Sequence, residues 1–139
     1  MMVIIDATDL VLGRLAAHAA KQALLGEKVD IVNCEKAIIT GSKRDVIGRY
    51  KKKHDRGSTR KGPFMDRQPD RFVKRTIRGM LPYKQEKGKL AFNRIKCYNG
   101  LPKDLEGKEM MSIDEAHAKN ISTDFGSVGT VCRELGGKW

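Results

Sequence analysis

The sequence predicts an α/β fold built on a mostly parallel sheet. Short apolar segments with β-branched residues alternate with segments of helical periodicity, which is the pattern of strands joined by helices. The apolar segments are also nearly continuous, as expected of strands covered on both faces. The chain has 139 residues, of which 40% are hydrophobic. We therefore expect residues 1–139 to form a single domain with a buried core.

The N-terminal segment predicts a strand followed by a helix. Val3–Asp6 is apolar and β-branched, and Thr8 or Asp9 can cap the next helix. Apolar residues then recur at helical spacing over residues 12–24. Gly26 is placed to end this helix.

Two further strands and a second helix follow. Lys28–Asn33 (KVDIVN) and Ala37–Thr40 (AIIT) have the composition of strands. The link between them leaves little room for a crossover helix, so we expect an irregular connection there. Gly41 and Ser42 then form a turn into a helix over about Lys43–Lys52.

The middle of the chain combines a basic loop with the best-defined helix. His54–Arg67 (HDRGSTRKGPFMDR) has almost no aliphatic content, so we expect an extended loop that is ordered only if something holds it. Pro69 and Asp70 suit the first turn of a helix, and Pro82 ends it after about Leu81. At 100° per residue the helix has one cationic and one apolar side. The cations are Arg71, Lys74, Arg75 and Arg78, and the apolar residues are Phe72, Val73, Ile77, Met80 and Leu81.

Four predicted elements complete the chain. Gln85–Asn93 is a weaker helix or a charged linker, and Ile95–Tyr98 is a fourth strand. Residues 101–109 form a loop. Ser112–Lys119 is predicted as a short helix, because its serine and the glutamate three residues on form a capping box. Asp124–Leu135 is the last predicted helix, with an apolar side at helical spacing.

Positive charge is concentrated in the middle of the chain. The net charge is +11, and residues 43–103 hold 20 of the 28 basic and 5 of the 17 acidic residues, a net of +15. The remaining residues have a net charge of −4. This distribution favours a basic binding region on a folded scaffold, for nucleic acid, an anionic membrane surface or an acidic partner. A solvated, loop-rich surface is the alternative.

The lack of a recognisable targeting signal and the spacing of the cysteines favour a cytosolic protein. No apolar run reaches about 18 residues, so no transmembrane helix is expected. The N-terminus lacks a basic region and turns acidic at once, so we expect no secretory signal. Cys34, Cys97 and Cys132 are odd in number and widely spaced, which favours reduced, partly buried thiols.

No group of residues in the sequence predicts a reaction. Gly41–Lys43 can contact one phosphate, but it lacks the spacing of a Walker A loop, and an ordinary turn explains it at least as well. The three histidines are far apart and no cysteines have C-x2-C spacing, so we expect no metal site. No G-x-S-x-G is present. An α/β enzyme acting on nucleotides or nucleic acid stays an alternative, because Asp6–Arg14 and Thr40–Lys43 form strand–turn–helix units.

The basic helix and the segments beside it predict an RNA-binding surface. Lysine and arginine neutralise phosphates, and arginine also stacks on exposed bases. Tyr50, Phe64 and Tyr83 can stack too, although local packing is the preferred interpretation of each. We expect recognition through phosphate geometry and RNA shape more than base identity. The predicted RNA-binding residues are Lys43, Arg44, Arg49, Lys51, Lys52, Lys53, His54, Arg56, Arg60, Lys61, Arg67, Arg71, Lys74, Arg75, Arg78 and Lys84.

Four segments of the sequence resemble one family. They are Val3–Leu15 (VIIDATDLVLGRL), Val32–Lys43 (VNCEKAIITGSK), Pro69–Lys84 (PDRFVKRTIRGMLPYK) and Ile95–Gly100 (IKCYNG). With their spacing they resemble the large-subunit ribosomal protein thirteen family (uL-thirteen) in its archaeal/eukaryotic form, over essentially the whole chain. The third segment is the most specific.

The resemblance implies a three-layer α/β/α fold with a four-stranded parallel sheet and a basic loop-helix extension. It implies a structural constituent of the large ribosomal subunit, bound to large-subunit ribosomal RNA, with neighbouring ribosomal proteins as further partners. No catalytic residue, cofactor, membrane or small-molecule substrate is implied, and the location is the cytoplasmic ribosome. Arg71, Arg75 and Arg78 would face RNA, and Arg56, Arg60 and Arg67 would thread against it. An RNA-binding regulator acting off the ribosome stays an alternative.

Overall fold

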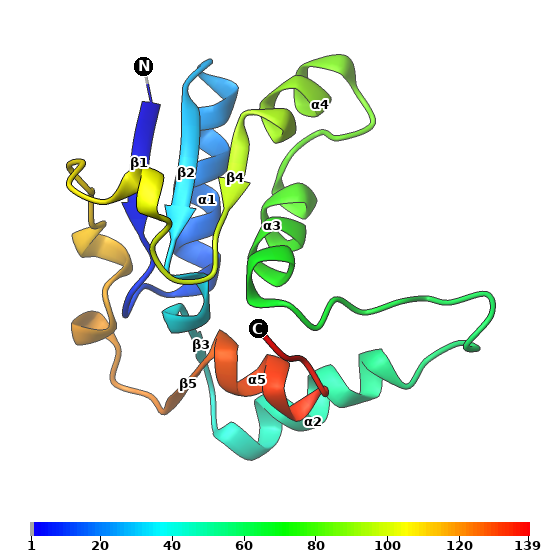
Figure 1. The fold of residues 1–139 in the computed structure, drawn as a ribbon. Coiled ribbons are helices and arrows are strands. Elements are labelled where there is room, and N and C mark those ends of the chain that lie inside the picture. Colours follow the sequence, from blue (N-terminus) through cyan, green and yellow to red (C-terminus); the bar gives the residue numbers. More distant parts are fainter. Residues whose placement is uncertain (1) are drawn as a thin grey trace.

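A three-stranded parallel sheet forms the centre of the molecule. The computed structural model describes residues 2–139. Strand β1 (Met2–Asp6) lies beside β2 (Lys28–Val32), and β2 lies beside β4 (Ile95–Cys97), giving the order β1-β2-β4 (Figure 1). Short β-branched segments form these strands, as their composition predicts.

Helices cover one face of this sheet. α1 (Leu12–Leu24) packs against β2, and it also packs against α3 (Pro69–Met80) and α4 (Glu86–Asn93). Ile5 and Ile31 are fully buried in the core beneath these helices. Since α4 is a helix, the helix interpretation of residues 85–93 is confirmed and the linker alternative is wrong. This layer holds α3 in place.

A coil segment, not a second helical layer, covers the other face. Successive residues of a strand point to opposite faces, so Ile4 and Val32 face away from α1. They form a small cluster with Leu105, which belongs to a 3-10 turn at Lys103–Leu105, and Tyr98 packs against it. The prediction of three complete α/β/α layers is therefore wrong in this part.

The predicted third strand does not join the main sheet. β3 (Ile38–Thr40) pairs antiparallel with β5 (Phe125–Ser127) in a separate two-stranded sheet, so the prediction of four strands in one sheet is wrong. The cause is the short link after β2. Asn33 adopts a left-handed φ of 57°, and a 3-10 turn at Cys34–Lys36 follows, which leaves no crossover helix to return β3 to the sheet.

The predicted cap of the first helix and the predicted helix over residues 112–119 are also wrong. α1 has Val11 as its N-cap, because Asp6 Oδ1 accepts from the backbone and hydroxyl of Thr8 and a left-handed φ of 58° removes Asp9 from a capping geometry. Residues 112–119 form two 3-10 turns, Asp114–Ala116 and Ala118–Asn120, in place of a helix.

The last helix is shorter than predicted. α5 (Val128–Glu134) begins four residues later than expected, since β5 takes residues 125–127. Ser127 caps it by accepting a hydrogen bond from the Thr130 backbone at 3.1 Å. α5 packs against α2 (Lys43–His54), which forms where the sequence predicts it and runs two residues further.

The three cysteines are free thiols, as predicted. Burial raises the pKa of Cys132 to about 12. A hydrogen bond with Cys97, and then burial, raise the pKa of Cys34 well above its usual value. Both thiols are buried and stay protonated at neutral pH. Within residues 2–139, no helix is both long and apolar enough to span a bilayer.

Gly88 permits a close approach that positions α4. A Cβ at this helical residue would overlap the carbonyl of Pro82, so we expect Gly88→Ala to destabilise the fold by about 1–3 kcal/mol through overpacking. Gly48→Ala is the control, because Gly48 is helical and exposed with open space around its Cα. Its expected effect is stabilisation by roughly 0.5–1 kcal/mol. Urea unfolding measures both, and equal stabilities would contradict this packing.

Candidate nucleic-acid interface

The two predicted faces of α3 are present in the structure. Phe72, Val73 and Ile77 are buried against the body, while Arg71, Arg75 and Arg78 are exposed and Lys74 is half-buried. Burying each large apolar side chain contributes about 1.5–3 kcal/mol. Repulsion between like charges one turn apart costs only about 0.2–0.5 kcal/mol per pair. The free energy gained by burial exceeds the cost of repulsion, so α3 packs on its apolar side and its four cations lie on the opposite side.

The apolar side of α3 is narrower than predicted. Leu81 is buried as expected, but Met80 is 44% exposed. It lines a shallow apolar hollow with Leu24 and Leu25 at the end of α1. Met80 is thus a surface residue, because α1 ends beside it and nothing further along α1 covers it.

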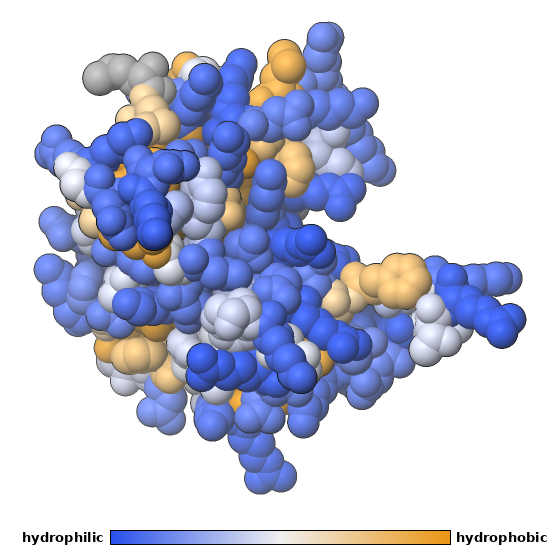
Figure 2. Space-filling model, in the orientation of Figure 1, coloured by the Kyte–Doolittle hydropathy of each residue, from blue (hydrophilic) through white to orange (hydrophobic). Residues whose placement is uncertain are grey.

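The cationic face forms the floor of a cleft. A hollow of about 410 Å³ is lined by Phe64 and Asp66, by the four cations of α3, and by Phe92 of α4. Residues 55–68, called the arm, project from the body (Figure 1). Phe64 and Asp66 of the arm line one side of the hollow, and Phe92 near the end of α4 lines another. Figure 2 shows a wide, mostly hydrophilic indentation between the arm and the α4 lobe. We call this hollow the cationic cleft.

Neighbouring groups orient the cations of α3. Arg75 Nη1 donates a 2.9 Å hydrogen bond to the carbonyl oxygen of Phe64 and lies 3.9 Å from Asp66 Oδ2. The Lys74 Nζ lies 4.7 Å from the centroid of the Phe92 ring. The Arg78 guanidinium lies 4.3 Å from the centroid of Tyr83. An aromatic ring attracts a cation without neutralising it, so the cleft keeps its positive charge.

Few carboxylates offset this charge. Within residues 2–139 the salt bridges are Arg75 to Asp66 and the contact between His54 and Asp55. The remaining predicted cations of the arm and α3 have no carboxylate within 4.0 Å in that part of the chain. Such a surface favours a polyanionic partner.

The arm is tied at its base and its tip. At the base, Arg67 Nη2 lies 2.8 Å from His54 Nε2, and His54 Nδ1 lies 3.3 Å from Asp55 Oδ1. At the tip, the backbones of Ser58 and Gly62 donate to each other at 3.1 and 2.9 Å. The C-terminal end lies against the arm, because Gln68 Nε2 donates to the carbonyl of Lys138 at 2.7 Å.

Most predicted RNA-binding residues are exposed, but they do not form one site. Of the sixteen, only His54 and Lys74 are half-buried. Arg71, Lys74, Arg75 and Arg78 meet in the cationic cleft, and His54, Arg56 and Arg67 line a second hollow of about 410 Å³ under the arm.

The first turn of α2 lies apart from the arm. Lys43 and Arg44 lie about 16 Å along the helix from His54, at 1.5 Å per residue. Ser42 caps this helix by accepting from the Asp45 backbone at 3.2 Å, so the turn at Gly41–Lys43 has a structural role.

The aromatic residues agree only in part with their predicted roles. Tyr50 packs on Phe72 with ring centroids 5.0 Å apart, as local packing predicts. Phe64 is 67% exposed, so its prediction as a packing residue is wrong. Phe92 and Asp66 line the cleft although the sequence did not single them out. The sequence feature that could have pointed to Phe92 is its position on the short helix that follows the basic helix α3.

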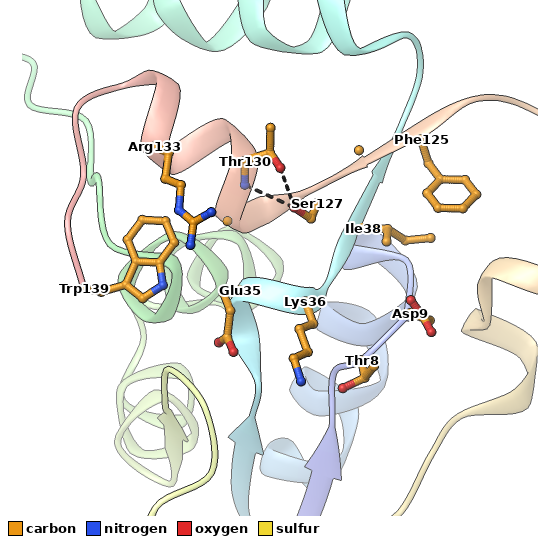
Figure 3. Close-up of a pocket in the computed structure, with 12 residues that line it drawn as sticks. Thr8, Asp9, Glu35, Lys36, Ile38, Phe125, Ser127, Thr130, Arg133 and Trp139 are labelled. Atoms are coloured by element: carbon orange, nitrogen blue, oxygen red, sulfur yellow. Dashed lines mark hydrogen bonds between the residues drawn. The ribbon is translucent and has the colours of Figure 1, made fainter.

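A third hollow lies where the strands β1 and β2 end. It measures about 410 Å³ and is lined by Asp9, Glu35, Arg133 and Trp139 among others (Figure 3). Enzymes with parallel sheets bind ligands at such edges. Glu35 Oε2 accepts from the Gly100 backbone at 2.9 Å, and Arg133 stacks on Trp139 at 5.2 Å. No histidine or cysteine is among the described residues lining it, so they supply no imidazole base or thiol nucleophile.

We expect the arm to be mobile in the free protein. It has fourteen residues with almost no buried apolar contact, and like charges repel along it until an anion neutralises them. Apart from Asp55, Ser58, Lys61 and Gly62, whose backbone amides donate hydrogen bonds, residues 55–64 should exchange within the dead time of a hydrogen-exchange experiment. Amides in the interior of α3 should be protected. Strong protection of the arm without RNA would show that this expectation is wrong.

Comparison with known proteins assigns the chain to a family. The profile of the family described as "Ribosomal protein L13" matches residues 1–104. The protein named "Large ribosomal subunit protein uL13" from Archaeoglobus fulgidus is 46% identical over 135 residues, covering 96% of this chain and 86% of that protein. The proteins of the same name from Methanococcoides burtonii and Methanosarcina barkeri are 43% and 44% identical, each over 99% of this chain and 100% of their own length. The chain therefore belongs to the ribosomal protein L13 family.

Proposed function

We propose that this chain is a structural constituent of the large ribosomal subunit that binds large-subunit ribosomal RNA through the cationic cleft and the arm. Its relatives are named as proteins of that subunit. In this role it supports subunit assembly and translation on cytoplasmic ribosomes, beside neighbouring ribosomal proteins. It forms one domain, acts without catalytic residues or a cofactor, and its partners include no membrane or small-molecule substrate.

The observation that carries this proposal is the cationic face of α3. Three arginines and one lysine line one hollow, and Asp66 is the single acidic residue among the described residues that line it. Arginine presents a planar fork of donors that matches two phosphate oxygens. Regularly spaced phosphates on a rigid RNA can engage such a row simultaneously, and the arm adds further cations beside it.

Sedimentation of the endogenous protein tests the proposed role. On a sucrose gradient at physiological salt, we expect nearly all of it to migrate with large subunits and ribosomes. Removing Mg²⁺ and digesting the RNA should release it to the top of the gradient. A large pool of free protein under native conditions would favour the RNA-binding regulator that acts off the ribosome.

The hollow beyond β1 and β2 motivates one competing function, an enzyme acting on nucleotides or nucleic acid. Its position at the carboxyl edge of a parallel sheet is the observation in its favour. Titration calorimetry of the isolated protein with nucleoside mono- and triphosphates at millimolar concentration separates the two. The structural role predicts no saturable heat, and saturable binding abolished by Lys36→Ala would favour the enzyme.

A further inference from the structure

The exposed Phe64 is the feature that phosphate binding alone does not explain. Its side chain is 67% exposed on the arm, whose other residues are mostly polar or charged. Burying a phenylalanine contributes about 1.5–3 kcal/mol to folding, and the free chain forgoes this gain. Lysine and arginine are sufficient to contact phosphates. An exposed ring beside a row of cations is suited to a partner that offers both an apolar face and negative charge.

Surrounding residues hold Phe64 at the mouth of the cationic cleft. Arg75 donates to the Phe64 carbonyl at 2.9 Å, which brings this part of the arm beside α3 in the structure. Gly62 makes room for the ring, because a Cβ at that position would lie 3.1 Å from the ring atoms Cδ2 and Cε2. The backbone pairing of Ser58 with Gly62 closes the tip of the arm just before the ring. The ring consequently borders the cleft without filling it.

The cleft combines an aromatic wall with a cationic floor. The volume of the cleft is about 410 Å³, which falls within the usual range of small-ligand pockets, roughly 300–1,000 Å³. Its charged groups are the four cations of α3 and Asp66, which lies beside Arg75. A ligand that matches both features has a planar ring and an anionic group close to it. A nucleotide unit has both.

We propose that the cationic cleft holds one unpaired nucleotide of RNA, with its base stacked on Phe64 and its adjoining phosphates on Arg71, Lys74 and Arg78. This inference rests on the proposed function and adds a specific subsite to it. Paired bases in A-form RNA keep their faces inside the stack, so only a nucleotide turned out of the helix can meet the ring. Stacking tolerates any base, since every base has a π-face.

Affinity measurements on Phe64 variants test the stack. With a large-subunit ribosomal RNA transcript, Phe64→Ala and Phe64→Leu should each weaken binding about 5- to 150-fold, the loss expected for one stacked base. Phe64→Tyr, which keeps the aromatic face, should bind within about twofold of the original. The slope of log affinity against log salt should not change in any of them, because no phosphate contact is removed.

The matched comparison is Arg71→Ala, which removes a cation from the same cleft. It should reduce the magnitude of the salt slope by about 0.7–0.9. If Phe64→Ala binds as tightly as the original while Arg71→Ala lowers the slope, the nucleotide subsite is refuted and the RNA-binding function stands. If neither variant differs from the original protein in affinity or salt slope, both the nucleotide subsite and the proposed RNA-binding function are refuted. Wild-type affinity of Phe64→Leu would also overturn stacking.

A fluorescence experiment detects the stack directly. The chain has one tryptophan, so Trp139→Phe gives a background in which Phe64→Trp places a single indole at the cleft. The probes are oligoadenylate RNA of about twelve nucleotides and an abasic ribose-phosphate oligomer of equal length and charge. We expect quenching by oligoadenylate and none by the abasic oligomer at equal occupancy. Equal responses to both would refute stacking.

One further outcome concerns a protein occupant. If Phe64→Ala leaves RNA affinity unchanged but reduces incorporation into large subunits, the ring contacts a neighbouring protein and the nucleotide subsite is wrong. Thermal unfolding accompanies every variant. Because the ring is mostly exposed, the unfolding midpoint of Phe64→Ala should stay within about 2 °C of the original.

Discussion

Replacing Arg71, Arg75 and Arg78 together by glutamate should abolish specific binding to large-subunit ribosomal RNA. The three guanidinium groups are exposed on one face of α3 and line one cleft. A hydrogen bond to a charged group contributes about 1.5–3 kcal/mol, so losing three corresponds to at least roughly 10³-fold in affinity. Repulsion between the new carboxylates and phosphates adds to this loss. Filter binding at physiological salt measures the change.

The control carries the same change in net charge elsewhere. Lys21, Lys28 and Lys119 are exposed and do not line the cationic cleft. Their joint replacement by glutamate should weaken binding by less than about tenfold, through the long-range field alone. Both variants should retain the circular dichroism spectrum and unfolding midpoint of the original. Equal losses for the two triple variants would show that net charge, not the cleft, determines binding.

Binding should also depend steeply on salt. If the cleft and arm make about 6–10 phosphate contacts, affinity falls roughly 10³–10⁵-fold between 50 and 200 mM monovalent salt, because each contact releases condensed counterions. Fifteen of the sixteen predicted residues lie in α2, the arm and α3, which is sufficient for that number of contacts. Affinity measured at four or more salt concentrations gives the slope.

A triple alanine variant tests whether the cationic cleft causes this salt dependence. Arg71→Ala, Arg75→Ala and Arg78→Ala combined should reduce the magnitude of the slope by about 2–3. Gly48→Ala, which changes no charge, should leave it unaltered. Salt-independent binding by the original protein would contradict an electrostatic interface altogether.

The local elements were predictable where a periodic pattern was strong. α1 and α3 lie where their apolar spacing predicts, because burial of one face determines both the helix and its orientation. The partner of β3 was not predictable, since pairing depends on a left-handed turn at Asn33 and on a segment about 90 residues later. Residues 112–119 show that a capping box alone does not form a helix without apolar burial.

The charges of the interface were predictable, but its shape was not. The 3.6-residue period placed Arg71, Arg75 and Arg78 on one side of α3, and the structure agrees. The sequence did not show that the arm folds back to place Phe64 opposite Phe92, because that arrangement depends on backbone contacts such as Arg75 with the Phe64 carbonyl. Sequence periodicity predicts the faces of one helix at a time, whereas the cleft is formed by the arm, α3 and α4 together.

Lysine reactivity inside the ribosome tests the central claim most directly. Lys74 is the lysine that lines the cationic cleft, and it is partly accessible in the free protein. Purified large subunits and free protein are treated with an amine-acetylating reagent, and mass spectrometry quantifies each lysine. We predict that Lys74 reacts in the free protein, is protected in the subunit, and becomes reactive again after nuclease digestion of the RNA. Equal reactivity of Lys74 in the intact subunit and in the free protein would contradict the cleft as the site of RNA binding.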